Sequence, residues 1–286
     1  MSLQTGKQTR PAGRPVSWRE VVVDGAVVRV MEAGEGDPLL FLHGWGLSPR
    51  AYADGITLLT AAGIKVIAPS LPGFGGSDGL ALSRQDLPAY ATRIGRLLDV
   101  MGVDVPAFVV GHSFGGGVAL QLATDRPEQV RALTLVNSIG GAPGRRAGLV
   151  DASWLRWALG AVGELGPRGF ARAVPSMARD FVPNLLRKPV TLALTARLAL
   201  TASLADQAAE LIARDLPVLF IWGDEDRIIA PGALADITSA LPTQVIHGHH
   251  GWLLTEPDEF ATLLRNALVV HVMLERARRN AQSRIC

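Results

Sequence analysis

The sequence contains a single cysteine, Cys286, the last of its 286 residues. One cysteine excludes an intrachain disulfide and any metal cluster built on cysteines. The first twenty residues are polar and basic and lack the apolar run of a secretory signal peptide. Both features suit a reducing compartment, so we expect a cytoplasmic protein.

Charge is also scarce, since only 19% of the residues are charged, and it is almost balanced. Lys and Arg number 28 and Asp and Glu number 26, which leaves a formal net charge of +2. This surplus is too small to supply the many phosphate contacts that drive nucleic-acid binding. We therefore expect no nucleic-acid partner.

The chain also lacks a hydrophobic segment that would be convincing as a membrane span. About twenty residues between Asp104 and Asp125 carry no formal charge, but Pro106, His112 and Gln121 interrupt them together with several glycines. This stretch is better explained as a short buried strand, a turn and a buried helix. Hydrophobic residues make up 48% of the chain, which is enough for a core and excludes global disorder.

Short apolar runs rich in β-branched residues recur along the chain and predict a sheet that is buried on both faces. Residues 20–34 are predicted to form two strands joined at Asp24-Gly25, a dipeptide that favours tight hairpins. Further strands are expected at residues 38–44, 64–70, 106–113, 130–138, 216–224 and 242–248. Helical patterns lie between most of them, as at 87–102, where Gly102 is a stop signal. Strands that alternate with helices predict a mostly parallel α/β sheet.

This alternation is interrupted between about Ile139 and Asp215, where no convincing strand pattern occurs. The segment is rich in Ala, Leu and Arg with interleaved aromatic residues, and structureless loops of this length are uncommon in compact domains. We predict that residues 139–215 form a helical cap over the working edge of the sheet. The remaining predicted parts are a core at 20–138 and 216–275, a flexible N-terminal segment at 1–19 and a tail at 276–286.

The strongest chemical signal is Gly111-His112-Ser113-Phe114-Gly115, a G-x-S-x-G motif between a predicted strand and a predicted helix. A nucleophile elbow requires this context. Small neighbours allow the backbone to crowd, so that the Ser113 hydroxyl projects from a strained turn. Ser113 is therefore the candidate nucleophile, and His112 is interpreted as the variable residue of the motif.

A serine hydroxyl needs a base that accepts its proton and an acid that orients the base. The acidic candidates beyond the strand predicted at 216–224 are Asp224, Glu225 and Asp226. The histidine candidates beyond the strand predicted at 242–248 are His247, His249 and His250. Their positions alone leave the choice within each group open.

Backbone hydrogen-bond donors are expected upstream of Ser113, where His43-Gly44-Trp45-Gly46 follows a predicted strand. A loop at this position can offer a backbone N–H to a developing oxyanion. We expect the amides of Trp45 and Phe114 to be the two donors, because Phe114 also opens a helix whose positive dipole end faces the same point. His43 is expected to hydrogen-bond within its turn and to position the Trp45 amide.

Together, four motifs resemble the α/β-hydrolase superfamily across residues 20–270, and in particular its capped esterase and lipase-like members. The motifs are HGWG, PSLPGFGGSDG, GHSFGG, and WGDEDRIIAP followed by HHGWLLTEPDEF. The resemblance implies an eight-stranded, mostly parallel sheet with helices on both faces, and no cofactor or metal. It also implies Ser113, Asp226 and His250 as catalytic residues. The family's G-x-x-D pattern selects Asp226, and the spacing to Pro257 selects His250.

The expected function is hydrolysis of carboxylic esters, with a small-molecule ester as the partner. Trp154, Trp157 and Trp252 are expected to line a pocket for apolar acyl groups of short to medium length. One alternative is carbon–carbon bond hydrolysis of ring-cleavage diketo acids, whose carboxylate would need a fixed Arg or Asn, with Arg50 as the candidate. Another alternative is a non-catalytic ligand-binding protein. The sequence leaves the oligomeric state open.

Overall fold

The computed structural model describes residues 16–60, 63–141, 166–229 and 241–282. Within these residues, the centre of the molecule is an eight-stranded sheet in the order β1-β2-β4-β3-β5-β6-β7-β8. The strands are β1 (Ser17–Val23), β2 (Ala26–Ala33), β3 (Asp37–Leu42), β4 (Ile64–Pro69), β5 (Ala107–His112), β6 (Val130–Val136), β7 (Val218–Gly223) and β8 (Thr243–Ile246). β2 is antiparallel to both of its neighbours, and all other neighbours are parallel. The predicted eight-stranded, mostly parallel sheet is confirmed.

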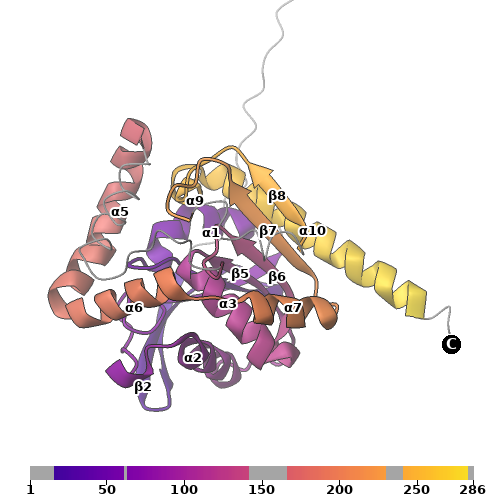
Figure 1. The fold of residues 1–286 in the computed structure, drawn as a ribbon, viewed down its shortest axis with the longest axis horizontal. Helices are drawn as coiled ribbons and strands as arrows, with labels where there is room; N and C mark the ends of the chain where they lie inside the picture. Colours follow the sequence, from indigo (N-terminus) through magenta and orange to yellow (C-terminus); the bar gives the residue numbers. More distant parts are fainter. Residues whose placement is uncertain (1–15, 61–62, 142–165, 230–240, 283–286) are drawn as a thin grey trace, which may run out of the picture.

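Helices cover both faces of this sheet (Figure 1). One face carries α2 (Leu87–Val100), α3 (Phe114–Asp125) and α7 (Ala205–Ala213), and the other carries α1 (Ala53–Leu59) and α10 (Pro257–Gln282). Side chains of a strand alternate between the two apolar clusters, as in β3, where Leu40 belongs to one and Phe41 to the other. Burial on both faces explains why these strands are nearly continuous apolar runs.

The hairpin of β1 and β2 turns at Asp24 and Gly25, whose φ angles are 50° and 76°. Positive φ at two consecutive residues suits a tight hairpin, and glycine adopts it without steric cost. β1 begins at Ser17, which pairs with Glu32 of β2. Residues 17–19 of the segment predicted at 1–19 are therefore part of β1.

A helical insert lies between β6 and β7, as predicted. Its described helices are α5 (Gly166–Arg187), α6 (Pro189–Thr201) and α7, and the described residues of this segment form no strand. α5 projects to the side of the core and α6 leads back toward it (Figure 1). α7 falls within the range predicted for the cap, but it contacts α3 and buries Ala208 and Leu211 in the core. α6 likewise buries Leu192, Ala196 and Ala199 in this core, so α5 is the described helix of the insert that projects to the side.

α10 continues to Gln282 and so runs past the start of the tail predicted at 276–286. Among the described helices, none combines the length and the apolar character that a bilayer crossing requires.

Candidate active site

Ser113 lies in a sharp turn between β5 and α3, at the carboxyl end of a central strand. Its φ and ψ angles are 53° and −118°, a strained conformation for a residue that carries a side chain. The turn is tight, because a Cβ on Gly115 would lie 2.3 Å from the carbonyl oxygen of Leu42. A Cβ on Gly111 would lie 2.5 Å from the oxygen of Gly115. Glycine is therefore required at both positions by close backbone contacts.

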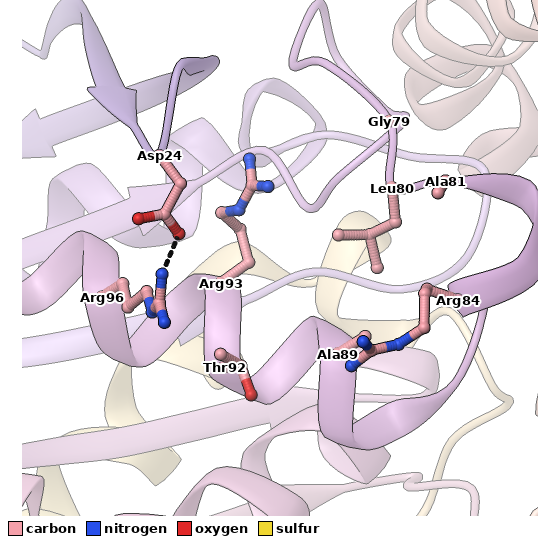
Figure 2. A pocket seen from close by; sticks show the side chains of 9 residues that line it. All are labelled: Asp24, Gly79, Leu80, Ala81, Arg84, Ala89, Thr92, Arg93 and Arg96. Atoms are coloured by element: carbon pink, nitrogen blue, oxygen red, sulfur yellow. Dashed lines mark ion pairs between the residues drawn. The ribbon is translucent and has the colours of Figure 1, made fainter.

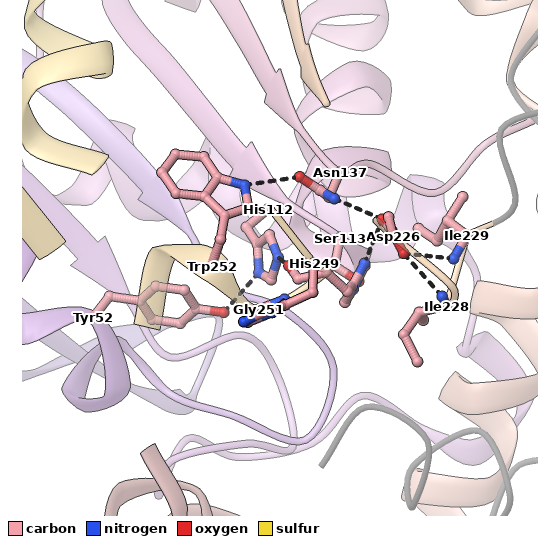
Figure 3. A network of polar contacts seen from close by, with 11 residues as sticks. Tyr52, His112, Ser113, Asn137, Asp226, Ile228, Ile229, His249, Gly251 and Trp252 are labelled. Atoms are coloured by element: carbon pink, nitrogen blue, oxygen red, sulfur yellow. Dashed lines mark hydrogen bonds and ion pairs between the residues drawn. The ribbon is translucent and has the colours of Figure 1, made fainter. Parts of the chain in front are cut away.

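Ser113, His250 and Asp226 lie in one hydrogen-bonded series, which we call the Ser–His–Asp chain (Figure 3). His250 Nε2 is 2.9 Å from Ser113 Oγ, and His250 Nδ1 is 2.8 Å from Asp226 Oδ2. The exposed fractions of Ser113, His250 and Asp226 are only 2%, 7% and 3%. The three residues follow β5, β8 and β7, and the carboxyl ends of parallel strands meet at one edge of a sheet. The structure thus brings together all three residues that were predicted to be catalytic.

Asp226 receives three further hydrogen bonds. Asn137 Nδ2 donates to Oδ2 over 2.6 Å, and the backbone N–H groups of Ile228 and Ile229 donate to Oδ1, each over 2.9 Å. Burial alone would raise the pKa of Asp226, but the nearby His250 and these donors outweigh it and hold the pKa below its usual value. The carboxylate is therefore ionised and held in one orientation toward the imidazole.

Asn137 is a site residue that the sequence analysis did not identify. It directly follows β6 with a φ of 44°, and its Oδ1 accepts a hydrogen bond of 3.1 Å from the indole N–H of Trp252. This bond leaves the Asn137 amide N–H₂ group to face Asp226 (Figure 3). The signal that could have identified Asn137 is a polar residue at the carboxyl end of a buried strand.

Trp252 is 2% exposed and packs against Phe260 in the core, in addition to its bond to Asn137. Its expected role in lining the substrate pocket stays a prediction. Trp154 and Trp157, the other two expected lining residues, lie outside the described residues.

Asp224, His247 and His249 were other candidates for the acid and the base, and their side chains make other contacts. The Asp224 side chain is 47% exposed and accepts from the Gly248 N–H at 3.1 Å, and His247 lies 3.3 Å from it. The Gly248 hydrogen bond is the main reason that the pKa of Asp224 is lowered. His249 Nδ1 accepts from the Gly251 N–H at 3.2 Å. Asp224 and His247 therefore contact one another, and Asp224 and His249 contact the loop backbone. His250 instead reaches Ser113, and Asp226 reaches His250.

The 43–48 loop follows β3 and contains Trp45, one of the expected oxyanion donors. The loop begins beside the Ser113 turn, because the carbonyl groups of Leu42 and His43 lie against Gly115. The other expected donor, Phe114, is the first residue of α3. A first helical residue has no acceptor for its amide within the helix, and the positive end of the helix dipole lies there.

His43 holds the 43–48 loop from within, as expected. Its Nδ1–H donates to the Gly44 carbonyl over 2.8 Å, and its Nε2 accepts from the Leu71 N–H over 2.8 Å. Burial lowers the pKa of His43 to about 4. The ring is therefore neutral near pH 7, and one tautomer satisfies both contacts.

His112 is bonded on both sides and is more than a variable motif residue. Its Nε2–H donates to the His250 carbonyl over 3.1 Å, so Nδ1 must be the acceptor for the Tyr52 hydroxyl at 2.8 Å. The Tyr52 oxygen in turn accepts from the Gly44 N–H over 3.1 Å. Burial lowers the pKa of His112 to about 3. A neutral His112 therefore links the His250 backbone to Tyr52, and through Tyr52 to the 43–48 loop. Figure 3 shows the contact between Tyr52 and His112.

A separate cavity of about 320 Å³ lies between the β1–β2 turn and α2 (Figure 2). Its lining includes Arg84, Arg93 and Arg96, and Arg96 forms a 2.6 Å ion pair with Asp24. It shares no residue with the Ser–His–Asp chain. Within the described part of the protein, no group of three or more His, Cys, Asp or Glu side chains is placed to hold a metal ion.

Residues 39–263 match the family model described as Alpha/beta hydrolase family. The match runs from β3 into α10 and includes the whole Ser–His–Asp chain. The chain therefore belongs to the alpha/beta hydrolase family.

The chain is similar to curated relatives over matches of different length. It is 35% identical over 146 residues to 2-hydroxymuconate semialdehyde hydrolase of Pseudomonas sp. (strain CF600), a match that covers 50% of this chain and 51% of the relative. The chain thus spans about half the length of that relative. It is 33% identical over 260 residues to the dihydrolipoyllysine-residue acetyltransferase component of the acetoin cleaving system of Cupriavidus necator, covering 86% and 67% of the two chains.

The fold is also similar to solved structures. A putative lipase from Acinetobacter baumannii AYE superposes with a TM-score of 0.72 at 21% identity, covering 90% of this chain and 92% of the lipase. At this identity the likeness establishes the fold and leaves the substrate undetermined.

Proposed function

We propose that this protein is a serine hydrolase that cleaves carboxylic esters through an acyl-enzyme intermediate. The observation that carries the proposal is the Ser–His–Asp chain, with its two hydrogen bonds of 2.9 and 2.8 Å. A buried serine, an imidazole and an ionised carboxylate in this order match the roles of nucleophile, general base and orienting acid.

In the proposed reaction, Ser113 Oγ attacks the ester carbonyl carbon while its proton passes to His250 Nε2. Asp226 accepts from the Nδ1–H of His250 and stabilises the imidazolium that forms. His250 then gives its proton to the leaving alcohol as the tetrahedral intermediate collapses to acyl-Ser113. A water molecule, deprotonated by His250, attacks the acyl group, and the acid and the free Ser113 hydroxyl are released.

The negative charge of each tetrahedral intermediate is proposed to be stabilised by the amides of Trp45 and Phe114. The position of Phe114 at the start of α3 supports its role, because the helix dipole favours an anion there. The closeness of the 43–48 loop to Gly115 supports the role of Trp45.

The proposed acyl group is apolar and of short to medium length. The side of the 43–48 loop that meets the insert is aromatic, since the rings of Trp45 and Phe181 lie 5.5 Å apart in an edge-to-face contact. An aromatic surface near a reactive serine favours an apolar group over a charged one. Trp154 and Trp157 are proposed to extend this surface.

Hydrolysis of a carbon–carbon bond is the second candidate, favoured by the 35% identity to 2-hydroxymuconate semialdehyde hydrolase. A diketo acid substrate would need a cation for its carboxylate, for which Arg50 was the candidate. The Arg50 guanidinium instead lies over the Trp18 ring at 5.3 Å and 3.7 Å from Asp180. Because Arg50 is engaged in these contacts, ester hydrolysis is the better supported proposal.

The test is a panel of p-nitrophenyl esters from acetate to octanoate, with labelling by a fluorophosphonate probe. We expect turnover and labelling by the wild-type protein and the loss of both in Ser113→Ala. Ser203→Ala is the matched control, because Ser203 is exposed and lies in the insert. It should behave as the wild-type protein does.

Adding a vinylogous diketo acid to the substrates separates the alternatives. Turnover of a vinylogous diketo acid in the absence of ester turnover would favour carbon–carbon bond hydrolysis. A folded protein that binds an ester without cleaving it, and that resists the fluorophosphonate, would contradict the proposal and favour a non-catalytic ligand-binding protein.

A further inference from the structure

Asp180, on α5 of the insert, is a buried carboxylate that the proposed reaction does not use. Its exposed fraction is 4%, and Asp226 is the other Asp or Glu that is buried among the described residues. Burial raises the pKa of Asp180 above its usual value. A buried carboxylate is poor evidence of a stabilising role, because its desolvation can cost more than its partners return. Its contacts therefore need another explanation.

The hydrogen bonds of Asp180 lie at the far end of the 43–48 loop, and the Arg50 guanidinium lies 3.7 Å from Asp180 Oδ1. Its Oδ2 accepts from the Ser48 N–H over 2.9 Å and from the Ser48 hydroxyl over 2.6 Å. Ser48 Oγ in turn accepts from the Arg50 N–H at 3.3 Å and caps the short helix that follows the loop. Asp180 thus determines where the loop ends and where the next helix begins.

Trp45, in the middle of the same loop, is held by the next helix of the insert. Its indole N–H contacts the Leu192 carbonyl at 3.2 Å and the Thr195 hydroxyl at 2.9 Å, both on α6. Phe181, beside Asp180 in α5, lies against Gly46, where an added Cβ would be 2.9 Å from its ring. Two helices of the insert therefore hold the loop that carries the Trp45 amide.

We propose that Asp180 is a positioning residue that couples the docking of the insert to the completion of the oxyanion site. The inference rests on the proposed function, in which the Trp45 amide is an oxyanion donor. Asp180 touches no reacting atom and acts through Ser48. The insert then contributes to the chemical step itself, in addition to any contact that it makes with the acyl group.

The expected effect follows from the precision that such donors require. Loss of a complete oxyanion donor costs roughly 100- to 1000-fold in kcat, and small displacements of reacting groups can also be costly. Asp180→Ala leaves the N–H and the hydroxyl of Ser48 without their acceptor and frees the end of the loop. The Trp45 amide would then be displaced while the Ser–His–Asp chain stays intact.

The experiment uses p-nitrophenyl acetate, whose acyl group is the smallest of the panel, and a trifluoromethyl ketone. Ser113 Oγ adds to the carbonyl carbon of the ketone while its proton passes to His250, and the oxyanion of the resulting hemiketal occupies the same site. For Asp180→Ala we expect kcat to fall about tenfold, a part of the effect of losing a whole donor, with little change in KM. Affinity for the ketone should fall by a similar factor. Asp180→Asn should recover most of both, because its amide oxygen can still accept from Ser48. Asp206→Ala, an exposed position on α7, is the control and should leave all values unchanged.

Ser48→Ala is the second variant, which keeps the test valid if Asp180→Ala does not fold. It removes the hydroxyl bond to Asp180 and the cap on the Arg50 N–H but keeps the bond from the Ser48 N–H to Asp180. It should therefore lower kcat and ketone affinity in the same direction by less. Unchanged kcat and ketone affinity in the folded variants, or a rise in KM alone, would overturn the coupling while the proposed function stands. A wild-type protein that neither turns over esters nor reacts with the fluorophosphonate would overturn the proposed function and this inference together.

Discussion

At the scale of single residues, orientation decides which of several similar side chains takes part in the Ser–His–Asp chain. Asp224 and Asp226 are two positions apart, yet Asp224 is half exposed and bonded to Gly248, while Asp226 is buried against His250. Asn137 and the two backbone donors hold the Asp226 carboxylate in place. The difference between the two acids is therefore one of environment.

This difference predicts that Asp226→Asn and Asp224→Asn have very different effects on ester hydrolysis. Asp226→Asn should lower kcat by up to about 10,000-fold, because the wrong imidazole tautomer is then favoured. Asp224→Asn should leave kcat close to that of the wild-type protein. Steady-state kinetics on one p-nitrophenyl ester compares them, and equal losses would show that the acid was assigned wrongly.

Tyr52→Phe should destabilise the protein and slow catalysis, because it leaves the Gly44 N–H and His112 Nδ1 without their shared partner. A buried polar group without a partner costs about 1–3 kcal/mol. The free energy of unfolding in urea measures the loss. Tyr90→Phe is the control. It also removes a buried hydroxyl, but one bonded to Gln85, so it should spare kcat. A Tyr52→Phe protein with wild-type stability would contradict the role of this network.

At the scale of elements, local signals predicted the strands and helices well. α2 begins after its N-cap Asp86, whose carboxylate accepts from the Ala89 N–H, and ends before Gly102, where φ is 67°. Gly102 is the stop signal predicted from the sequence, whereas the N-cap Asp86 is identified from the structure. Local signals do not predict which elements come together around Ser113, because this depends on contacts with β3 and with the insert.

The tight contact between α3 and the end of β3 predicts that Gly115→Ala is strongly destabilising. The new Cβ would lie 2.3 Å from the Leu42 oxygen, a backbone atom that cannot move aside, so a loss of about 3 kcal/mol is expected. Gly79→Ala is the matched control, since its Cβ would meet nothing closer than 3.9 Å. Thermal and urea unfolding compare the two, and an equally stable Gly115→Ala protein would refute the close approach.

At the scale of the whole molecule, three buried histidines make stability depend on pH. Burial lowers the pKa of His43, His112 and His271 from 6.5 to about 4, 3 and 4. The unfolded chain binds these protons at a higher pH than the folded protein does. Their contribution to stability is therefore complete above pH 6.5 and is lost as the pH falls toward 4 and below.

We predict that the free energy of unfolding falls steeply between pH 6.5 and 4. His271→Gln should reduce this slope by about one proton, or about 1.4 kcal/mol per pH unit. His247→Gln should leave it unchanged, because the His247 side chain is 81% exposed. Urea unfolding at several pH values provides the slopes. If the two variants had equal slopes, His271 would not be neutral in the folded protein.

The sequence by itself determined the strands, the helices between them, the turn at Ser113 and the family, because these depend on apolar periodicity, caps and glycines that act over a few residues. It also selected Ser113, Asp226 and His250 through motifs. Only the tertiary structure decided that Asn137 holds Asp226, that Tyr52 and His112 join two loops, and that Asp180 contacts Ser48. The partners in these contacts are 89, 60 and 132 positions apart, and no local pattern encodes which polar groups meet when the sheet and the insert pack together.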